Sequence, residues 1–269
     1  MNDILKRERS PLFVIAGPCV IESAELCLTI GAHMKRVCDS LGLTYVFKAS
    51  FDKANRSSNA SFRGPGLDDG IAILQRVKRE IGVPVLTDIH EPQQAARAAT
   101  VVDILQVPAF LARQTDLLLA CGQTGRTVNV KKGQFMSPQE MGNAVDKVRS
   151  TGNHSVLLTE RGTFFGYNRL VNDFTALPIM RSLGVPVCFD ITHSTQQPAG
   201  LGNQSGGNPQ FSPMLARAAV AAGVDGLFLE CHPDPKNAKS DAATMLNMSD
   251  VEPLLASCNQ IAELRKSWA

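Results

Sequence analysis

Short apolar runs rich in β-branched and aromatic residues recur along the whole chain and alternate with segments of helical spacing. The runs are near-continuous rather than alternating, which is typical of parallel strands covered on both faces. They predict strands at residues 13–16, 43–47, 83–87, 104–107, 128–130, 156–158, 185–189 and 226–229. The remaining periodic segments predict helices at residues 24–40, 66–81, 92–100, 115–124, 138–150, 174–183, 213–222 and 252–268.

Proline and glycine punctuate this pattern. Ser137-Pro138 and Ser212-Pro213 predict helix starts, with proline at the first helical position. Glycines are expected where helices end, because they adopt a left-handed backbone at low cost. The glycines in these places are Gly42, Gly82, Gly125, Gly152, Gly184 and Gly223.

Strands that alternate with helices in this number favour an α/β fold, a single-domain (β/α)8 TIM barrel. A doubly wound open sheet is the alternative, and the lack of a G-x-G-x-x-G motif after the first strand weakens its dinucleotide-binding form. The sequence shows no linker and no convincing repeat over its 269 residues. We therefore expect one barrel domain over residues 1–269, with a short N-terminal extension at about residues 1–11.

Composition narrows the class of protein. Hydrophobic residues make up 44% of the chain, charged residues 19%, and the net charge is +2, which argues against a nucleic-acid-binding surface. No apolar run approaches the ~20 residues needed to cross a bilayer, and MNDILKRERSP lacks the apolar stretch of a secretory signal. We expect a soluble cytoplasmic protein that binds neither nucleic acid nor membrane.

The seven cysteines are scattered and form no C-x-x-C pair. This spacing suggests neither a disulfide framework nor a local zinc ribbon. Most of them are expected to be small core hydrophobes.

Chemically active side chains follow every predicted strand. Any one of them could be a capping or solvated residue, but the carboxyl ends of all strands meet at one mouth of a barrel. The series therefore predicts an active site. In strand order it runs Cys19; Lys48 and Lys53; Asp88 and His90; Gln106; Lys131 and Lys132; Glu160 and Arg161; Asp190 and His193; Glu230 and His232.

Barrel closure brings the seventh, eighth and first strands together, and with them Cys19, His193 and Glu230. A thiolate, an imidazole and a carboxylate are a plausible site for a borderline divalent metal such as Zn²⁺ or Fe²⁺, with Asp241 as a fourth ligand. The ligands are spread over most of the chain, so their spacing adds little. A buried, unliganded Cys19 is the alternative.

The cations fall on the other strands. Lys48, Lys53, Lys131 and Arg161 could neutralise a substrate that carries several negative charges.

The densest polar stretch is KASFDKANRSS at residues 48–58, directly after a predicted strand. Residues 196–210 form a Gly- and Gln-rich loop that is either a surface spacer or, as we expect, a lid over the mouth. These residues predict a metal-assisted enzyme for phosphorylated, anionic metabolites.

Longer motifs identify a family. IAGPCVIES, KASFDKANRSS, PAFLARQTDLL, VNVKKGQF, LTERGTFFGYN, LECHPDP and SDAATML resemble those of the 3-deoxy-manno-octulosonate 8-phosphate synthase family along nearly the whole chain. The resemblance implies a (β/α)8 barrel, usually a homotetramer. It also implies a transferase that condenses phosphoenolpyruvate with arabinose 5-phosphate and water. Phosphate is released with an eight-carbon sugar acid phosphate (KDO 8-phosphate) of bacterial lipopolysaccharide biosynthesis.

The resemblance also implies roles for individual residues. Catalytic roles fall to Lys53, Asp88 and His193. The phosphoenolpyruvate site would comprise Lys48, Lys53, Lys131 and Arg161, assisted by Ser50, Gln106 and the Ala109 backbone. The arabinose 5-phosphate site would comprise Lys53, Asn55, Arg56 and Ser57, with Asp88 towards the sugar and Arg113 reaching in from a neighbouring subunit.

The family has two classes, and one of them replaces the metal-binding cysteine by asparagine. This chain has Cys19 in GPCVIES together with His193, Glu230 and Asp241, so it resembles the metal-dependent class. The ion could be Zn²⁺, Fe²⁺, Mn²⁺ or Co²⁺.

Three rivals are weaker. A 3-deoxy-arabino-heptulosonate 7-phosphate synthase, which uses erythrose 4-phosphate, typically has a K-P-R-T-S-like tract where this chain has KANRSS. A Schiff-base aldolase would use Lys131 or Lys53 as its nucleophile. A non-catalytic sugar-phosphate sensor should have lost part of the polar ring, and no member is missing.

Overall fold

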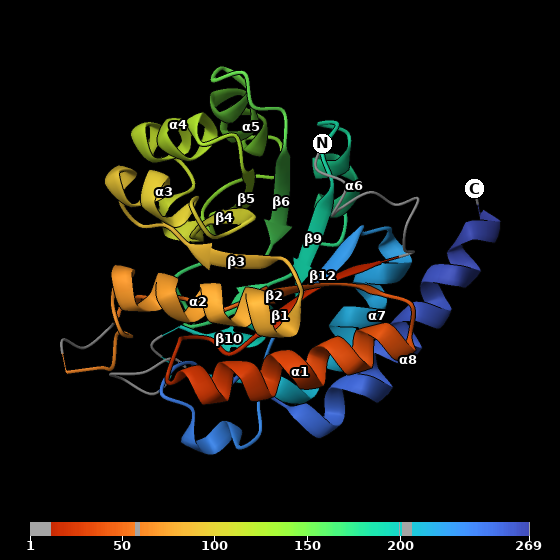
Figure 1. Cartoon of the computed structure of the whole chain (residues 1–269). Helices are drawn as coiled ribbons and strands as arrows, with labels where there is room; N and C mark the ends of the chain where they lie inside the picture. Colours follow the sequence, from red (N-terminus) through yellow and green to blue (C-terminus); the bar gives the residue numbers. More distant parts are fainter. Residues whose placement is uncertain (1–11, 57–59, 199, 201–205, 269) are drawn as a thin grey trace.

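Eight parallel strands close into a barrel in the computed structural model, which describes residues 12–56, 60–198, 200 and 206–268 (Figure 1). Each strand pairs with the next along the chain, and β1 pairs with β12 to close the ring. The predicted (β/α)8 barrel is confirmed. The staves are β1 (Phe13–Gly17), β2 (Thr44–Lys48), β3 (Val85–Asp88), β4 (Ile104–Val107), β5 (Thr127–Lys131), β6 (Val156–Glu160), β9 (Val187–Asp190) and β12 (Gly226–His232). The expected N-terminal extension lies outside the described residues.

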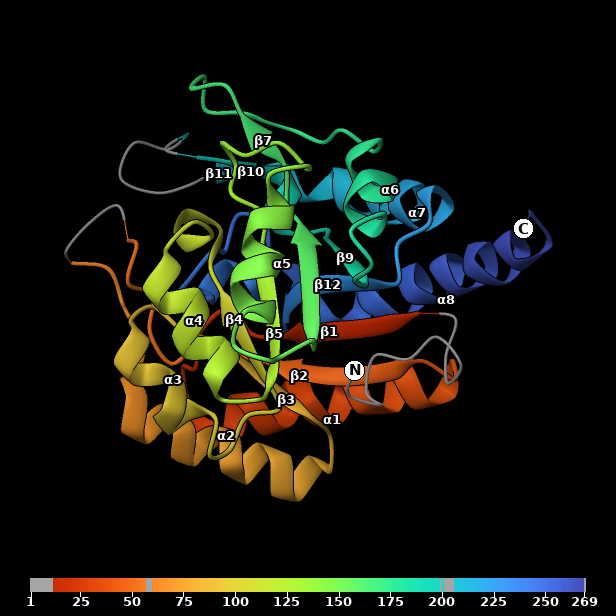
Figure 2. The ribbon, with the colours of Figure 1, turned by 90° about the horizontal axis from the view of Figure 1, so that it is seen from above.

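Helices surround the strands (Figures 1 and 2). The six glycines expected at helix ends all have positive φ, and Gly82 and Gly223 are the left-handed C-caps of their helices. The helices are α1 (Ala24–Ser40), α2 (Leu67–Ile81), α3 (Pro92–Ala98), α4 (Thr115–Gln123), α5 (Met141–Arg149), α6 (Ala176–Arg181), α7 (Ser212–Ala222) and α8 (Met248–Arg265).

Two helix starts differ from the prediction by three residues or more. The helix expected from residue 138 begins at Met141, because Ser137 and Glu140 first close a turn in which the Ser137 amide and hydroxyl donate to Glu140 Oε2 at 2.8 and 3.0 Å. The last helix begins at Met248 rather than residue 252, because Asn247 caps it and accepts a hydrogen bond from the Ser249 amide at 3.0 Å.

Short elements decorate the barrel, and the apolar pattern did not predict them. Two antiparallel hairpins, β7–β8 and β10–β11, lie close together in Figure 2. Asn168, between β7 and β8, donates to the carbonyl of Pro198 just after β10. The short strands are β7 (Thr163–Phe164), β8 (Leu170–Val171), β10 (Gln196–Gln197), β11 (Gly206–Gly207) and β13 (Leu246–Asn247). Short 3-10 helices are η2 (Ala109–Leu111), η3 (His193–Thr195), η4 (Pro209–Phe211), η5 (Pro235–Asn237) and η6 (Lys266–Trp268).

Alternate residues of each stave face the two sides of the barrel wall. Outward-facing side chains join the helices in a large apolar sleeve. Inward-facing ones fill the amino-terminal half of the barrel, so this part is a packed core rather than a pore. Its members are Phe13, Ile15, Val46, Leu86, Ile104, Leu157, Cys188 and Phe228. On the staves other than β1, which has Gly17 there, the next inward positions towards the carboxyl ends are polar, and they begin the site.

The first stave ends in a close backbone approach. A Cβ on Gly17 would lie 2.0 Å from the carbonyl oxygen of Lys48, so only glycine fits here. The chain then runs beside the end of β2, where the Ile21 amide donates to the Ser50 carbonyl at 2.9 Å. This path carries Cys19 over the mouth. None of the helices in the described ranges has the length and apolar run that a membrane crossing requires.

Candidate active site

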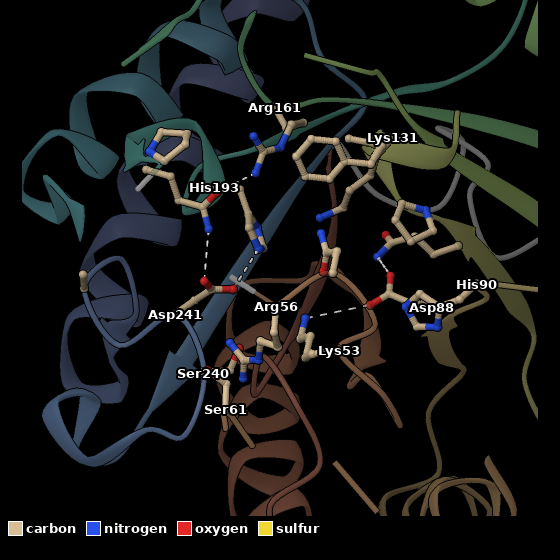
Figure 3. Close-up of a pocket in the computed structure, with 18 of the residues that line it drawn as sticks. Lys53, Arg56, Ser61, Asp88, His90, Lys131, Arg161, His193, Ser240 and Asp241 are labelled. Carbon is tan, nitrogen blue, oxygen red and sulfur yellow. Dashed lines mark hydrogen bonds and ion pairs between the residues drawn. The ribbon is translucent and has the colours of Figure 1, made fainter. Parts of the chain in front are cut away.

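A cavity of about 680 Å³ opens at the carboxyl ends of the staves. Figure 3 shows its charged side chains converging from opposite sides of the mouth. Its lining includes residues expected from strands two to seven: Lys48, Lys53, Asp88, His90, Gln106, Lys131, Arg161 and His193, together with Asp241. The strand-end side chains of these six strands therefore lie around one cavity.

Four cations, which we call the cationic cradle, line one part of this cavity: Lys48, Lys53, Lys131 and Arg161. Lys48 is 1% exposed, and its Nζ donates to the Cys19 carbonyl at 2.9 Å and to Glu230 Oε1 at 2.5 Å. Lys131 Nζ lies 3.6 Å from the centre of the Phe228 ring. These contacts hold the ammonium groups at fixed places on the floor of the mouth.

Lys53 and Arg161 complete the cradle. Burial lowers the pKa of Lys53, but Cys19 and Glu230 raise it, and the net shift is upward. Burial lowers the pKa of Arg161, although a guanidinium keeps its charge in proteins. Arg161 Nη1 is buried and has no hydrogen-bond partner among the described residues. An unpaired buried N–H that faces a cavity suits an anionic guest.

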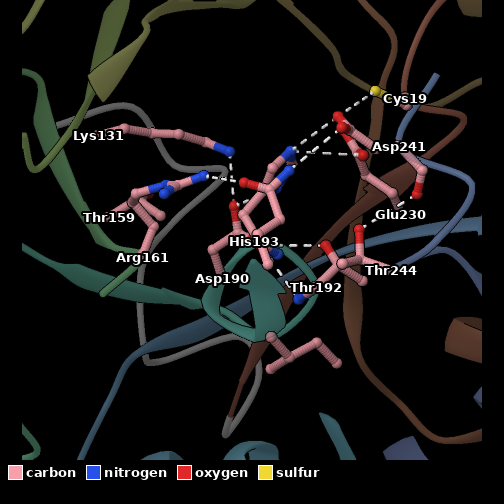
Figure 4. A network of polar contacts seen from close by, with 12 residues as sticks. Cys19, Lys131, Thr159, Arg161, Asp190, Thr192, His193, Glu230, Asp241 and Thr244 are labelled. Carbon is pink, nitrogen blue, oxygen red and sulfur yellow. Dashed lines mark hydrogen bonds and ion pairs between the residues drawn. The ribbon is translucent and has the colours of Figure 1, made fainter. Parts of the chain in front are cut away.

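Four potential metal ligands, which we call the acidic corner, gather beside the cradle: Cys19, His193, Glu230 and Asp241 (Figure 4). Ligand atoms of Cys19, Glu230 and Asp241 all lie within 4.8 Å of one another. His193 Nε2 is 3.6 Å from Glu230 Oε2 and 3.6 Å from Asp241 Oδ2. The four residues predicted from distant parts of the sequence are thus brought together.

The corner fits a divalent ion. Glu230 Oε2 is buried and has no hydrogen-bond partner within the described chain, which is costly unless another group satisfies it. Sulfur, nitrogen and two carboxylate oxygens form a donor set that suits Zn²⁺ or Fe²⁺. The other ring nitrogen of His193 lies 2.7 Å from Asp190 Oδ2, the outer-shell carboxylate that commonly orients a ligating histidine.

The charges of the corner are set by its neighbours. Burial raises the pKa of Glu230, but Lys48 and His193 oppose it and the net shift is downward. Burial lowers the pKa of His193, but Asp190 and Glu230 raise it overall. Burial, Asp241 and Glu230 all raise the pKa of Cys19. Its thiol lies 3.1 Å from Asp241 Oδ2 and 3.0 Å from Ser240 Oγ.

The predicted sugar side lies across the cavity from β5 and β6. Asn55 and Arg56 line the cavity, and Arg56 Nη2 donates to the carbonyls of Phe62 and Lys239 at 2.8 and 3.0 Å. Asp88 lies 3.9 Å from Lys53 Nζ. Ser57 lies outside the described residues.

The remaining predicted residues are placed as follows. Ala109 begins η2 and lines the cavity, whereas Arg113 is exposed in the segment before α4 and does not line it. Gln196 and Gln197, the start of the predicted lid, pair with Gly206 and Gly207. His232 Nε2 lies 3.9 Å from Glu22 Oε1, and Cys231 faces the outer sleeve.

Sequence analysis gave no role to several residues that organise the site. Asp190 is fully buried and contacts both Lys131, at 2.6 Å, and His193. Gln196 accepts from Arg161 Nη2 at 2.7 Å and donates to Asp241 Oδ1 at 3.2 Å. The only signal for Asp190 was its place at a strand end, and the only signal for Gln196 was its place at the start of the expected lid.

A third buried ion pair joins two adjacent staves. Lys132 directly follows β5, Glu160 ends β6, and the two side chains are 3.6 Å apart. Glu160 Oε1 also accepts hydrogen bonds from the amides of Arg161 and Gly162 at 2.9 and 2.7 Å. The pair therefore joins the ends of β5 and β6, which carry Lys131 and Arg161.

Comparison with known proteins assigns the chain. The model of the DAHP synthetase I family matches residues 1–267. The chain belongs to the DAHP synthetase I family. Curated relatives likewise cover nearly the whole chain.

Three relatives illustrate the similarity. A protein of Cyanothece sp. is 57% identical over 99% of this chain and 97% of its own length. A protein of Desulfatibacillum aliphaticivorans is 54% identical over 96% of this chain and 93% of its own length. A protein of Protochlamydia amoebophila is 50% identical over 98% of this chain and 96% of its own length. Each is named 2-dehydro-3-deoxyphosphooctonate aldolase, another name for 3-deoxy-manno-octulosonate 8-phosphate synthase. The family resemblance drawn from the motifs is confirmed.

Proposed function

We propose that this chain condenses phosphoenolpyruvate with arabinose 5-phosphate and water, releasing phosphate and 3-deoxy-manno-octulosonate 8-phosphate. The observation that carries the proposal is the shared name of relatives that are 50–57% identical over nearly the full chain. The cavity supports it, because four cations and an acidic corner are suited to two phosphorylated reactants and an ion. The seven free thiols agree with the reducing cytoplasm as the location.

The cationic cradle would hold phosphoenolpyruvate. Its phosphate and carboxylate need several fixed positive charges, and an arginine can bind either group in a bidentate manner. The unpaired Nη1 of Arg161 and the ammonium of Lys53 are available for this purpose. Gln106 and the backbone of Ala109 would add neutral hydrogen bonds, and Ser50, whose hydroxyl donates to Asp88, would assist by fixing that carboxylate.

Arabinose 5-phosphate would enter from the opposite side. Asn55, Arg56 and Ser57 would bind its phosphate end, and Asp88 would orient the sugar near Lys53. Arg113 does not line its own cavity, so we propose that it serves that of a neighbouring subunit.

We propose a homotetramer. Large exposed apolar side chains lie on the loops after β4, β5 and β6 and at the start of α7, as expected of a surface that another subunit covers. They are Phe110, Phe135, Phe165, Tyr167 and Met214, each 47% exposed or more.

The acidic corner would hold one divalent ion, with Cys19, His193, Glu230 and Asp241 as ligands. A bound ion there would act as a Lewis acid on the aldehyde or on water. The protein groups have separate tasks. Lys53 neutralises charge on the reacting phosphoenolpyruvate, and Asp88 orients the hydroxyls of the sugar. Fixed geometry would favour attack of C3 of phosphoenolpyruvate on the aldehyde carbon while water adds at C2.

A Schiff-base mechanism is disfavoured by the lysines themselves. A nucleophilic lysine needs a depressed pKa, whereas the pKa of Lys53 is raised despite burial. Lys131 donates to Asp190 at 2.6 Å, so its nitrogen is engaged as a cation. The raised pKa of Lys53 and the hydrogen bond from Lys131 to Asp190 suit anion binding rather than imine formation.

The test is phosphate release with two aldose phosphates. Arabinose 5-phosphate should be used with a kcat/KM at least about tenfold above that of erythrose 4-phosphate. Chelation should abolish turnover, and Zn²⁺, Fe²⁺, Mn²⁺ or Co²⁺ should restore it to different extents. A preference for erythrose 4-phosphate would refute the substrate assignment, and full activity after exhaustive chelation would refute the metal assignment alone.

A further inference from the structure

Five buried side chains beneath the mouth form one unbroken hydrogen-bonded chain across neighbouring staves. Thr159 Oγ1 donates to Asn129 Oδ1 at 2.8 Å, and Asn129 Nδ2 donates to Gln106 Oε1 at 2.8 Å. Gln106 Nε2 donates to Asp88 Oδ1, and Ser50 Oγ donates to Asp88 Oδ2. None of the five is more than 6% exposed. We call these residues the polar belt.

The belt lies between two layers of the barrel. Below it are the apolar inward residues of the same staves, Leu86, Ile104 and Leu157. Above it is the cavity, where Figure 3 shows Asp88. Asp88, Gln106 and Asn129 are direct neighbours in the register of β3, β4 and β5.

The donor and the acceptor of each hydrogen bond in the belt are determined by the negative charge of Asp88 at one end. Burial raises the pKa of Asp88, but Lys48 and Lys53 lower it well below its usual range. Asp88 is therefore a carboxylate, which can only accept hydrogen bonds. Gln106 must turn its NH2 group towards Asp88.

The same constraint passes along the belt. With its NH2 group on Asp88, Gln106 presents only an oxygen to Asn129. Asn129 must then donate to that oxygen and present its own oxygen to Thr159, whose hydroxyl must donate. Each amide has a single allowed orientation because its neighbour has one, so the belt can run in one direction only.

We propose that Asn129 and Thr159 are positioning residues that act on Asp88 through Gln106, fixing the carboxylate by a one-way chain of hydrogen bonds. Neither residue lines the cavity, so neither can contact a substrate itself. The consequence for catalysis rests on the proposed function, in which Asp88 orients the sugar. The one-way chain stands on the contacts alone.

The first experiment tests direction by thermal unfolding, which requires no substrate. Asn129→Asp keeps shape but cannot donate, so Gln106 must reverse and point its oxygen at the Asp88 carboxylate. Adding Asp88→Asn supplies a donor to that oxygen and restores a complete belt, in which the two links of Gln106 are reversed while Thr159 and Ser50 still donate. The double variant should therefore melt about 2–8 °C above the sum of the single effects, although residues 88 and 129 do not touch.

Relief of charge repulsion alone would also favour the double variant, and Asp88→Ala separates the two causes. It removes the same charge but offers no donor to Gln106. We expect the coupling of Asn129→Asp with Asp88→Ala to be at most about half of that with Asp88→Asn. Equal couplings, or none with Asp88→Asn, would overturn the one-way chain.

The second experiment tests the effect on the site with the intact enzyme. Thr159→Val removes the terminal donor and should raise KM for arabinose 5-phosphate about three- to tenfold more than KM for phosphoenolpyruvate. Thr159→Ser keeps the hydroxyl and should restore the wild-type ratio. Equal changes in both KM values would overturn the positioning role. Loss of the proposed function would instead appear as wild-type protein that does not use arabinose 5-phosphate.

Discussion

The acidic corner and the cationic cradle are adjacent, buried and opposite in charge, yet they are built differently. The corner gathers anionic side chains around a Glu230 oxygen that has no hydrogen-bond partner among the described residues, so its chemistry suits a cation. The cradle consists of cations, and Arg161 has an N–H group without a partner among the described residues, so its chemistry suits an anion. If every cation were paired with a carboxylate of the corner, the two regions would neutralise each other. The structure instead links them at a few places and leaves Glu230 Oε2 and Arg161 Nη1 without hydrogen-bond partners among the described residues.

Three residues link the cradle to the corner. Lys48 forms an ion pair with Glu230. Asp190 lies between Lys131 and His193, and Gln196 lies between Arg161 and Asp241. Lys53 differs, because its ion pair is with Asp88 at 3.9 Å. A variant of Cys19 should therefore affect the corner, and a variant of Lys53 should affect the cradle. A variant of Asp190 should affect both regions.

Cys19→Ala should break the corner alone and have the largest effect. Loss of the thiolate ligand should reduce bound metal from about one ion per chain to a small fraction, and activity should fall with it. The Cys19 carbonyl that accepts from Lys48 is kept, so phosphoenolpyruvate should bind the metal-free variant within about twofold of metal-free wild type. Elemental analysis and equilibrium binding measure the two quantities.

Cys121→Ala is the matched control, since this thiol is fully buried in the helical sleeve. It should keep wild-type metal content. Retention of stoichiometric metal by Cys19→Ala would remove Cys19 from the ligand set and leave a buried core cysteine in its place.

The difference between the two regions also explains what sequence could predict. The staves were predicted because continuous β-branched runs such as residues 104–107 are buried on both faces and leave little ambiguity. The corner was predicted because barrel closure places strand ends seven, eight and one together, which is a property of the fold. Neither result needs any knowledge of side-chain direction.

The features that the sequence did not predict depend on where side chains point or on short local turns. Asp190 and His193 follow the same strand, but only their packing shows that one carboxylate serves both the histidine and Lys131. The hairpin of β7 and β8 has two-residue strands, too short for any period to appear. The start of α5 depended on a turn closed by Ser137 and Glu140, which competes locally with helix initiation.

Lys53→Ala should break the cradle alone, with the second-largest effect. A charge that stabilises the reacting phosphoenolpyruvate would be lost, and kcat/KM should fall on the order of 100- to 1000-fold. Metal content should stay at the wild-type level, because Lys53 supplies no ligand. Lys35→Ala, at an exposed ion pair on α1, is the control and should leave both quantities unchanged. A wild-type rate for Lys53→Ala would show that the cradle acts without it.

Asp190→Asn should weaken both regions, by less in each. Asp190 Oδ1 accepts from the amides of Thr192 and His193 at 3.2 and 2.9 Å, so an asparagine must keep its oxygen there. Its NH2 group then faces Lys131 and His193 Nδ1. It repels the ammonium and, by donating to Nδ1, puts the imidazole proton on Nε2, the atom that faces Glu230 and Asp241.

Metal affinity of this variant should therefore fall about 10- to 100-fold, and phosphoenolpyruvate affinity up to about tenfold, both measured by titration calorimetry. Thr192→Val is the control, because it removes one 3.1 Å hydrogen bond to Asp190 and keeps the carboxylate. It should change each affinity by less than about threefold. If Asp190→Asn weakened the binding of only one of the two ligands, the carboxylate would belong to that region alone, and Lys48 and Gln196 would remain as the links between the corner and the cradle.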